Sequence, residues 1–216
     1  MKPLTYALLA DAAYCVTPTF GAANSAARAV STTTEDGLAI GFPGTNDLAC
    51  WQANLDVRLV NTHQLGAVHH GFWDSVQSLW PMLSQKTPVV IYGHSEGAAL
   101  ALLYAALLCL AGKPPGAVFA FEPPKVSADS VLGTVLSNAG VALHLYRNGN
   151  DLVPLVPVGI RGIAEWQHPA PLIPIGKPLL PLPNVQDHLM GRVISGIKAL
   201  VPVPVSIRHI TSEAAQ

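Results

Sequence analysis

One serine, Ser95, lies between two glycines in the stretch IYGHSEGAAL, residues 91–100. Gly93, Ser95 and Gly97 fit the pattern G-x-S-x-G, in which a serine on a sharp strand-to-helix turn exposes its hydroxyl above the edge of a sheet. The apolar runs VVIY before the turn and AALALLYAALL after it supply the strand and the helix. We therefore interpret Ser95 as a nucleophile. The alternative is a serine that only caps the helix.

A serine nucleophile needs a base, and the base needs a carboxylate to orient it. In hydrolases with this turn the acid and then the histidine follow the serine along the chain. Asp151 follows the run VALHLYR, so it lies in a loop at the carboxyl end of a strand, where sites on parallel sheets are built. Asp129 reads as a helix cap and Asp187 is next to a histidine. We expect Asp151 to be the acid, and the alternative is a turn aspartate.

Three histidines follow Asp151, namely His168, His188 and His209. His168 ends a segment typical of a strand that leaves the core, and His209 lies close to the end of the sequence. His188 is predicted at the start of a helix, after a long loop that can carry it over the sheet edge. We expect His188 to be the base.

The sequence predicts elements that alternate between strands and helices. We expect a helix from about residue 4 and a hairpin over about 27–42. Helices follow over about 71–85, 98–110, 128–138 and 187–200, and buried strands over about 89–92, 116–121 and 141–147. This alternation predicts an α/β fold with a mostly parallel sheet and helices on both faces. Eight prolines between Val153 and Asn184 exclude a helix or a central strand through most of that segment, and its apolar character predicts an ordered loop.

Composition limits the classes of partner. The 216 residues fit a single domain, 1–216, and 12 basic residues against 13 acidic ones provide no positive field for nucleic acid. Three cysteines, Cys15, Cys50 and Cys109, are too few for a disulfide framework, although one bridge can form. The start MKPLTYALLADAAYC fits an amphipathic helix better than a signal peptide, and no apolar run spans a bilayer. These features favour the cytoplasm.

Together the motifs resemble the class 3 lipases of the α/β-hydrolase fold, a family that includes fungal triacylglycerol lipases and feruloyl esterases. The resemblance runs in family order from about residue 4 to residue 200. It is carried by AIGFPGTND from Ala39, VHHGF from Val68, GHSEGAALALL from Gly93, RNGNDLVPLVP from Arg147 and DHLMGRV from Asp187.

The resemblance implies roles for Ser95 as nucleophile, Asp151 as acid and His188 as base. It also implies an oxyanion hole, with backbone N–H groups of Thr45 and Glu96 as donors. Two positions depart from the family pattern. Pro43 stands where the family has arginine. Glu96 stands where it has leucine, either as an acid favoured in the first turn of a helix or as a polar group that faces the substrate.

The sequence thus predicts a serine hydrolase that cleaves carboxylic esters through an acyl-enzyme, with no metal ion and no organic cofactor. The alternatives are a phospholipase, a carbohydrate-ester esterase, and a non-catalytic binding protein on the same scaffold. In the resembling lipases the interval after Thr45 carries a lid. Here Leu48, Trp51 and Leu55 have helical spacing, so they form either a lid that contacts lipid or a core-facing stripe.

Overall fold

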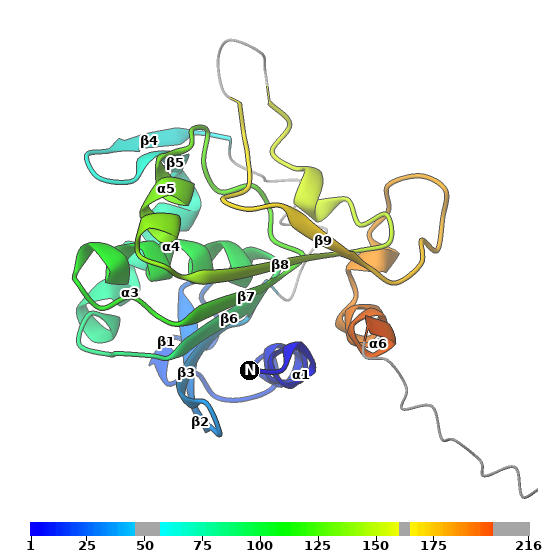
Figure 1. The fold of residues 1–216 in the computed structure, drawn as a ribbon, viewed down its shortest axis with the longest axis horizontal. Helices are drawn as coiled ribbons and strands as arrows, with labels where there is room; N and C mark the ends of the chain where they lie inside the picture. Colours follow the sequence, from blue (N-terminus) through cyan, green and yellow to red (C-terminus); the bar gives the residue numbers. More distant parts are fainter. Residues whose placement is uncertain (46–56, 160–164, 201–216) are drawn as a thin grey trace, which may run out of the picture.

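A seven-stranded sheet forms the centre of the computed structural model, which describes residues 1–45, 57–159 and 165–200 (Figure 1). The strands, in their order across the sheet, are β1 (Phe20–Gly21), β2 (Arg28–Thr34), β3 (Gly37–Phe42), β6 (Val90–His94), β7 (Ala117–Phe121), β8 (Ala142–Asn148) and β9 (Leu172–Ile175). Pairing is antiparallel from β1 to β3 and parallel from β3 to β9. The predicted α/β class, mostly parallel sheet and N-terminal hairpin are confirmed.

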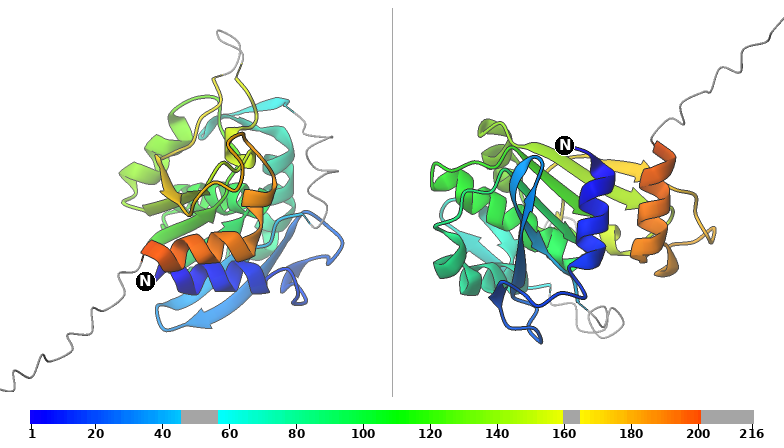
Figure 2. Two further views of the ribbon diagram at one scale, coloured as in Figure 1. Left: turned by 90° about the vertical axis from the view of Figure 1, so that its right-hand side faces the viewer. Right: turned by 90° about the horizontal axis from the view of Figure 1, so that it is seen from below.

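Helices cover both faces of this sheet. One face carries α3 (His70–Leu83), α4 (Glu96–Leu110) and α5 (Val131–Asn138), and the other carries α1 (Pro3–Ala12) and α6 (Met190–Leu200), which lie side by side (Figures 1 and 2). Helix α4 packs against β6, β7, α3 and α5. It can be surrounded in this way because its sequence is apolar on every side.

The central strands are buried on both faces, which explains why they read as unbroken apolar runs. In β6, Val90 and Tyr92 belong to the core beneath α1 and α6, whereas Ile91 belongs to the core beneath α3, α4 and α5. This alternation follows from the two-residue period of a strand. The loops at the carboxyl edge are therefore attached to strands that are buried on both faces.

Several elements differ from the sequence-based expectation. A separate hairpin of β4 (Leu59–Thr62) and β5 (Gly66–His69) was not predicted. The proline-rich segment contains a short 3₁₀ turn, η1 (Val153–Leu155), and the strand β9, which also was not predicted. Because β9 is at the edge of the sheet, it tolerates Pro174, as edge strands do. The described part of this segment contains no α-helix and no central strand, as the prolines predicted.

His188 does not start a helix, contrary to the prediction. It closes a 3₁₀ turn, η2 (Gln186–His188), and α6 begins only at Met190. Leu189 between them has extended backbone angles, with φ −63° and ψ 131°. The predicted helix after residue 128 likewise begins later, at Val131, because the Asp129 side chain accepts the Val131 N–H instead.

Some predictions fall outside the described residues, namely those for Leu48, Trp51, Leu55, Cys50 and His209. Cys15 and Cys109 are not joined to each other. Of the helices that the structure describes, none is both long and apolar enough to cross a bilayer.

Candidate active site

Ser95 occupies a strained turn between β6 and α4. Its backbone has φ 58° and ψ −131°, a region that non-glycine residues rarely adopt, and its N–H donates to the Phe121 carbonyl at 2.9 Å. Gly97 permits this turn because a Cβ there would collide with the Phe42 carbonyl. The G-x-S-x-G pattern therefore reports close packing of β3, β6 and α4, with Ser95 at the sheet edge.

The loop after β3 brings Thr45 to the serine. A Cβ on Gly44 would lie 2.9 Å from the Ser95 Cβ and 2.8 Å from the His94 carbonyl, so only glycine fits. Arg28 fixes the loop from β2, because its guanidinium donates to the Gly44 carbonyl at 2.8 Å. Thr45 and Ser95 consequently line one pocket.

Asp151 and His188 form a direct, buried hydrogen bond. Nδ1 of His188 lies 2.6 Å from Oδ2 of Asp151, and the side chains are 4% and 0% exposed. A carboxylate can only accept, so Nδ1 carries the hydrogen and Nε2 is left as an acceptor. Oδ1 of Asp151 accepts the Val153 N–H at 3.0 Å. The pair thus has a fixed tautomer and a fixed orientation.

The loops that carry Asp151 and His188 are joined by hydrogen bonds. Asn184 and Asp151 form a parallel bridge, and the Leu152 N–H donates to the Asn184 carbonyl at 3.1 Å. The Asn148 side chain donates to the Asp187 carbonyl at 2.8 Å. These bonds hold the end of the proline-rich segment against the end of β8, which explains how a residue outside the regular helices reaches the acid.

The serine and the histidine open into one pocket of about 290 Å³. The Ser95 hydroxyl and Nε2 of His188 are both buried, and neither makes a hydrogen bond within the described part of the chain. The pocket is lined by Asp11, Tyr14, Thr45, His94, Ser95, His188, Leu189 and Met190. A hydroxyl group, an imidazole nitrogen and an apolar wall therefore meet at the carboxyl edge of the sheet.

Two lining residues, Tyr14 and His94, were not singled out from the sequence. Nε2 of His94 donates to the His188 carbonyl at 3.0 Å, so Nδ1 accepts the Tyr14 hydroxyl at 2.6 Å. Burial, with the nearby His188, holds the pKa of His94 well below its usual value. His94 therefore connects Tyr14, which follows α1, to the backbone of His188. The position of His94 directly before Ser95, within the G-x-S-x-G pattern, is the signal in the sequence that could have identified it.

The Glu96 side chain is buried in the first turn of α4, at 8% exposure. Burial raises the pKa of its carboxyl, and the positive charge of Arg28 opposes that shift. Glu96 is not among the residues that line the pocket of Ser95 and His188. This geometry favours the interpretation of Glu96 as an acid in the first turn of a helix over that of a polar group that faces the substrate.

Glu122 is a second buried carboxyl that the sequence-based analysis missed. It directly follows β7, and this position after an apolar strand was the available signal. Oxygens of Glu122 and Asp151 and a ring nitrogen of His188 all lie within 4.8 Å of one another. Two carboxylates and a histidine are residue types that can bind a cation. Here, however, Asp151 and His188 are already hydrogen-bonded to each other at 2.6 Å.

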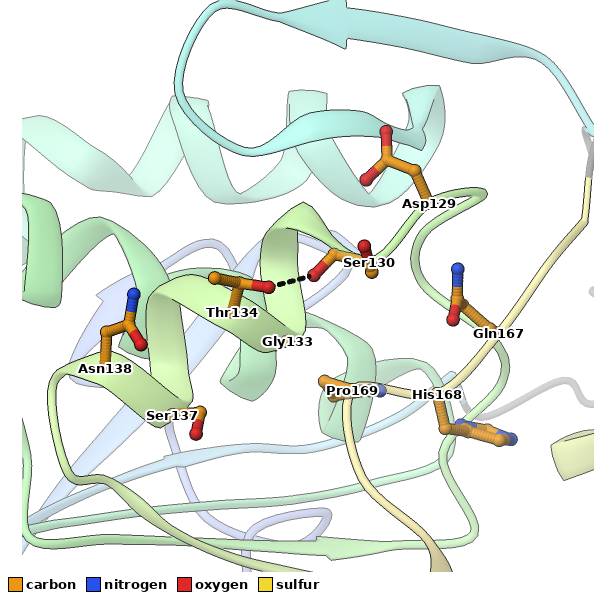
Figure 3. Close-up of a pocket in the computed structure, with 9 residues that line it drawn as sticks. All are labelled: Asp129, Ser130, Gly133, Thr134, Ser137, Asn138, Gln167, His168 and Pro169. Carbon is orange, nitrogen blue, oxygen red and sulfur yellow. Dashed lines mark hydrogen bonds between the residues drawn. The ribbon is translucent and has the colours of Figure 1, made fainter.

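The other histidines lie elsewhere. His168 lines a separate pocket of about 310 Å³ beside α5, together with Asp129 and Thr134 (Figure 3). Its Nε2 is 2.9 Å from the Pro154 carbonyl. His69 ends β5 and stacks on Phe72. Of the histidines that the structure describes after Asp151, His188 is the one that meets the acid.

The family model described as lipase (class 3) matches residues 39–160, more than half of the chain. The chain belongs to the class 3 lipase family. It is accordingly a serine hydrolase that cleaves carboxylic esters, as the sequence predicted. No curated protein matches it.

Solved lipase structures share the α/β-hydrolase fold of this class 3 lipase. A lipase from Rhizopus microsporus var. chinensis is 17% identical, with a TM-score of 0.69 over 86% of this chain and 84% of the other. Lipase II from Rhizopus niveus has the same identity and score over 86% and 91%. A mono- and diacylglycerol lipase from Aspergillus oryzae is 19% identical, with a TM-score of 0.56 over 87% and 83%.

Proposed function

We propose that this class 3 lipase hydrolyses acyl esters, acylglycerols among them, with Ser95 as nucleophile, His188 as base and Asp151 as the orienting acid. The observation that carries the proposal is the buried 2.6 Å bond between Nδ1 of His188 and Asp151. The other ring nitrogen of His188, Nε2, is left without a partner in the described chain, and His188 and Ser95 line the same pocket. The printed name of the Aspergillus oryzae relative supports acylglycerols as the substrate class. The apolar Leu189 and Met190 suit an acyl chain.

The reaction proceeds in two halves. Ser95 Oγ attacks the ester carbonyl carbon while Nε2 of His188 takes the hydroxyl proton, and the imidazolium returns that proton to the departing alcohol. Water then attacks the acyl-enzyme by the same proton route, which releases the carboxylic acid and regenerates the serine. Asp151 holds the Nδ1–H tautomer throughout.

The oxyanion is assigned to the backbone N–H groups of Thr45 and Glu96. Glu96 starts α4, so its N–H points out of a helix N-terminus, where negative charge is favoured. Thr45 lines the same pocket as Ser95. One such donor is worth about 3 kcal/mol of transition-state stabilisation.

A fluorophosphonate probe tests the nucleophile. We expect the probe to label the wild type but not Ser95→Ala, whose hydrolysis of p-nitrophenyl butyrate is abolished. Ser127→Ala is the matched control, because Ser127 is also 1% exposed with an unpartnered hydroxyl in the described chain. Labelling of folded Ser95→Ala, or loss of labelling in Ser127→Ala, would contradict the assignment.

Histidine variants test the base. His188→Ala should lower kcat by at least about a thousandfold. His168→Ala, in the separate pocket, should stay within about tenfold of the wild type. The reverse order would move the base to His168.

Contact with a lipid surface is a further part of the proposal. It rests on the spacing of Leu48, Trp51 and Leu55, which lie outside the described residues. Trp51→Ala should lower hydrolysis of emulsified long-chain esters by more than about tenfold and change that of soluble butyrate esters little. Equal losses on both substrates, with a lowered melting temperature, would make Trp51 a packing residue.

A further inference from the structure

Glu122 has an unusual backbone for its residue type. Its φ is 52°, and among the described residues only Ser95 shares a positive φ without being glycine. The two residues follow neighbouring parallel strands, β7 and β6. Left-handed backbone costs a residue with a Cβ about 1 kcal/mol or more, so it persists where the surroundings impose it.

The Glu122 side chain is completely buried against the proposed acid. Its Oε1 accepts the Asn148 N–H at 2.6 Å. Its Oε2 has no hydrogen-bond partner within the described chain. One carboxyl oxygen of Glu122 lies within 4.8 Å of a carboxyl oxygen of Asp151. One oxygen of this carboxyl therefore has a hydrogen bond and the other has none within the described chain, while a second buried carboxyl group lies close by.

Two ionised carboxylates buried this close together would repel each other, and this repulsion favours a proton on one of the two groups. Asp151 accepts two donors, the Val153 N–H and Nδ1–H of His188. Within the part of the chain that the structure describes, Glu122 accepts the Asn148 N–H alone. The proton consequently belongs on Oε2 of Glu122, where it completes the missing hydrogen bond.

The electrostatic surroundings agree with this placement. Burial raises the pKa of Glu122 well above its usual value, and the adjacent Asp151 adds to the rise. The Asn148 N–H and the positive charge of Arg147 oppose it without cancelling it. Together with His188, these are the groups that face the Glu122 carboxyl.

We propose that Glu122 is a positioning residue, a protonated carboxylic acid whose Oε2–H donates to Asp151. The inference rests on the proposed role of Asp151 as the acid that orients His188. The Asp151 carboxylate then receives three donors, from Val153, His188 and Glu122. This arrangement fixes the carboxylate plane and adds no second negative charge beside the histidine.

Two substitutions of similar size test the hydrogen bond. Glu122→Met removes the donor, and we expect kcat to fall by roughly 10- to 100-fold with little change in KM. Glu122→Gln can donate an amide N–H to Asp151 and accept from Asn148, so it should recover most of that loss. Both variants keep a side chain on the left-handed backbone, and melting temperatures identify a folding defect. Full activity in folded Glu122→Met would overturn the proposal.

The pH profile of kcat/KM separates a neutral Glu122 from an ionised one. If Glu122 is neutral, the acidic limb is the same in wild type and Glu122→Gln. If it is ionised, the substitution removes a negative charge near His188, the imidazolium becomes less stable, and the limb moves to lower pH. A shift in that direction would refute the protonated acid.

Infrared difference spectra give a readout independent of activity. Subtraction of Glu122→Gln from the resting wild type at neutral pH should leave the carbonyl stretching band of a protonated carboxylic acid, and its absence would refute the proposal. The parent assignment fails differently. If Ser95→Ala and Asp151→Asn stay active, the proposed function is wrong. If both are inactive and Glu122→Met is unaffected, only the role of Glu122 is wrong.

Discussion

Asp151 and Asp187 are both fully buried aspartates close to His188, yet their surroundings give them different tasks. Asp151 receives one backbone N–H and the ring of His188. Asp187 receives the Asn150 and Leu179 N–H groups, the Asn184 side chain and the Arg192 guanidinium. The first carboxylate is bonded to a group that can exchange protons. The second is saturated by groups that cannot.

The difference shows that burial alone does not identify a catalytic acid. Asp187 precedes His188 in the sequence, but its carboxylate is bonded to the surrounding loops. Asp151 is distant in sequence, and the joined loops carry it to the ring. The identity of the donors, rather than the depth of the carboxyl, distinguishes the two.

The largest expected effect is on catalysis. Asp151→Asn should lower kcat by about 10⁴-fold, because the amide can donate to the ring and so favours the wrong tautomer. The fold should survive, since the side-chain oxygen still accepts the Val153 N–H. Steady-state kinetics with p-nitrophenyl butyrate and thermal melting measure both effects. An equal loss of kcat in an Asp187→Asn variant would show that the two aspartates do not differ in their effect on catalysis.

The next effect is on stability. Asp187→Asn should lower the free energy of unfolding by about 1–3 kcal/mol, because buried N–H donors and Arg192 lose their charged acceptor. Urea unfolding measures this loss, with the exposed Asp74→Asn as control. An Asp187→Asn protein with wild-type stability but without activity would show that Asp187 takes part in catalysis.

The smallest effect is a pH dependence of that stability difference. Burial by itself raises the pKa of Asp187, but the hydrogen bonds from Asn150, Asn184 and Leu179, with the charge of Arg192, outweigh it and leave the pKa lowered. The stabilisation is therefore complete above the pKa of an unfolded aspartate, about 3.9, and is lost as pH falls through the lower folded value.

Urea unfolding at a series of acidic pH values measures this dependence. The wild type and Asp187→Asn should differ most at neutral pH and converge at the acid end. A difference that stays constant with pH would show that the packing of the loop, rather than the charge of Asp187, supplies the stabilisation.

Most of the fold could be predicted because its signals are local. Buried strands such as β6 and helices such as α4 are apolar runs of characteristic length, and their order fixes a mostly parallel sheet. The short strands β1, β4, β5 and β9 carry no such signal. β9 contains proline, and only pairing with β8, which is distant in sequence, makes it a strand.

The site could be predicted in part. Ser95 has a local motif, and chain order leads to Asp151 and His188, which the structure brings together. The predicted start of α6 was wrong, because tertiary hydrogen bonds to Asp187 hold the turn that precedes the helix. Glu122 was missed because its environment depends on the ends of β7 and β8, which meet only in the folded sheet.

The contact between α1 and α6 has a consequence for biosynthesis. Their apolar faces, including Tyr6 and Ala10 from α1 and Val193 and Ile197 from α6, close one core. Translation produces α1 and the sheet first, so this core stays open, with its apolar surface exposed, until α6 is made. His188 lies just before α6, so the segment that seals the core also delivers the proposed base. A partly translated chain that lacks this segment therefore has Ser95, but it has neither a closed core nor the proposed base.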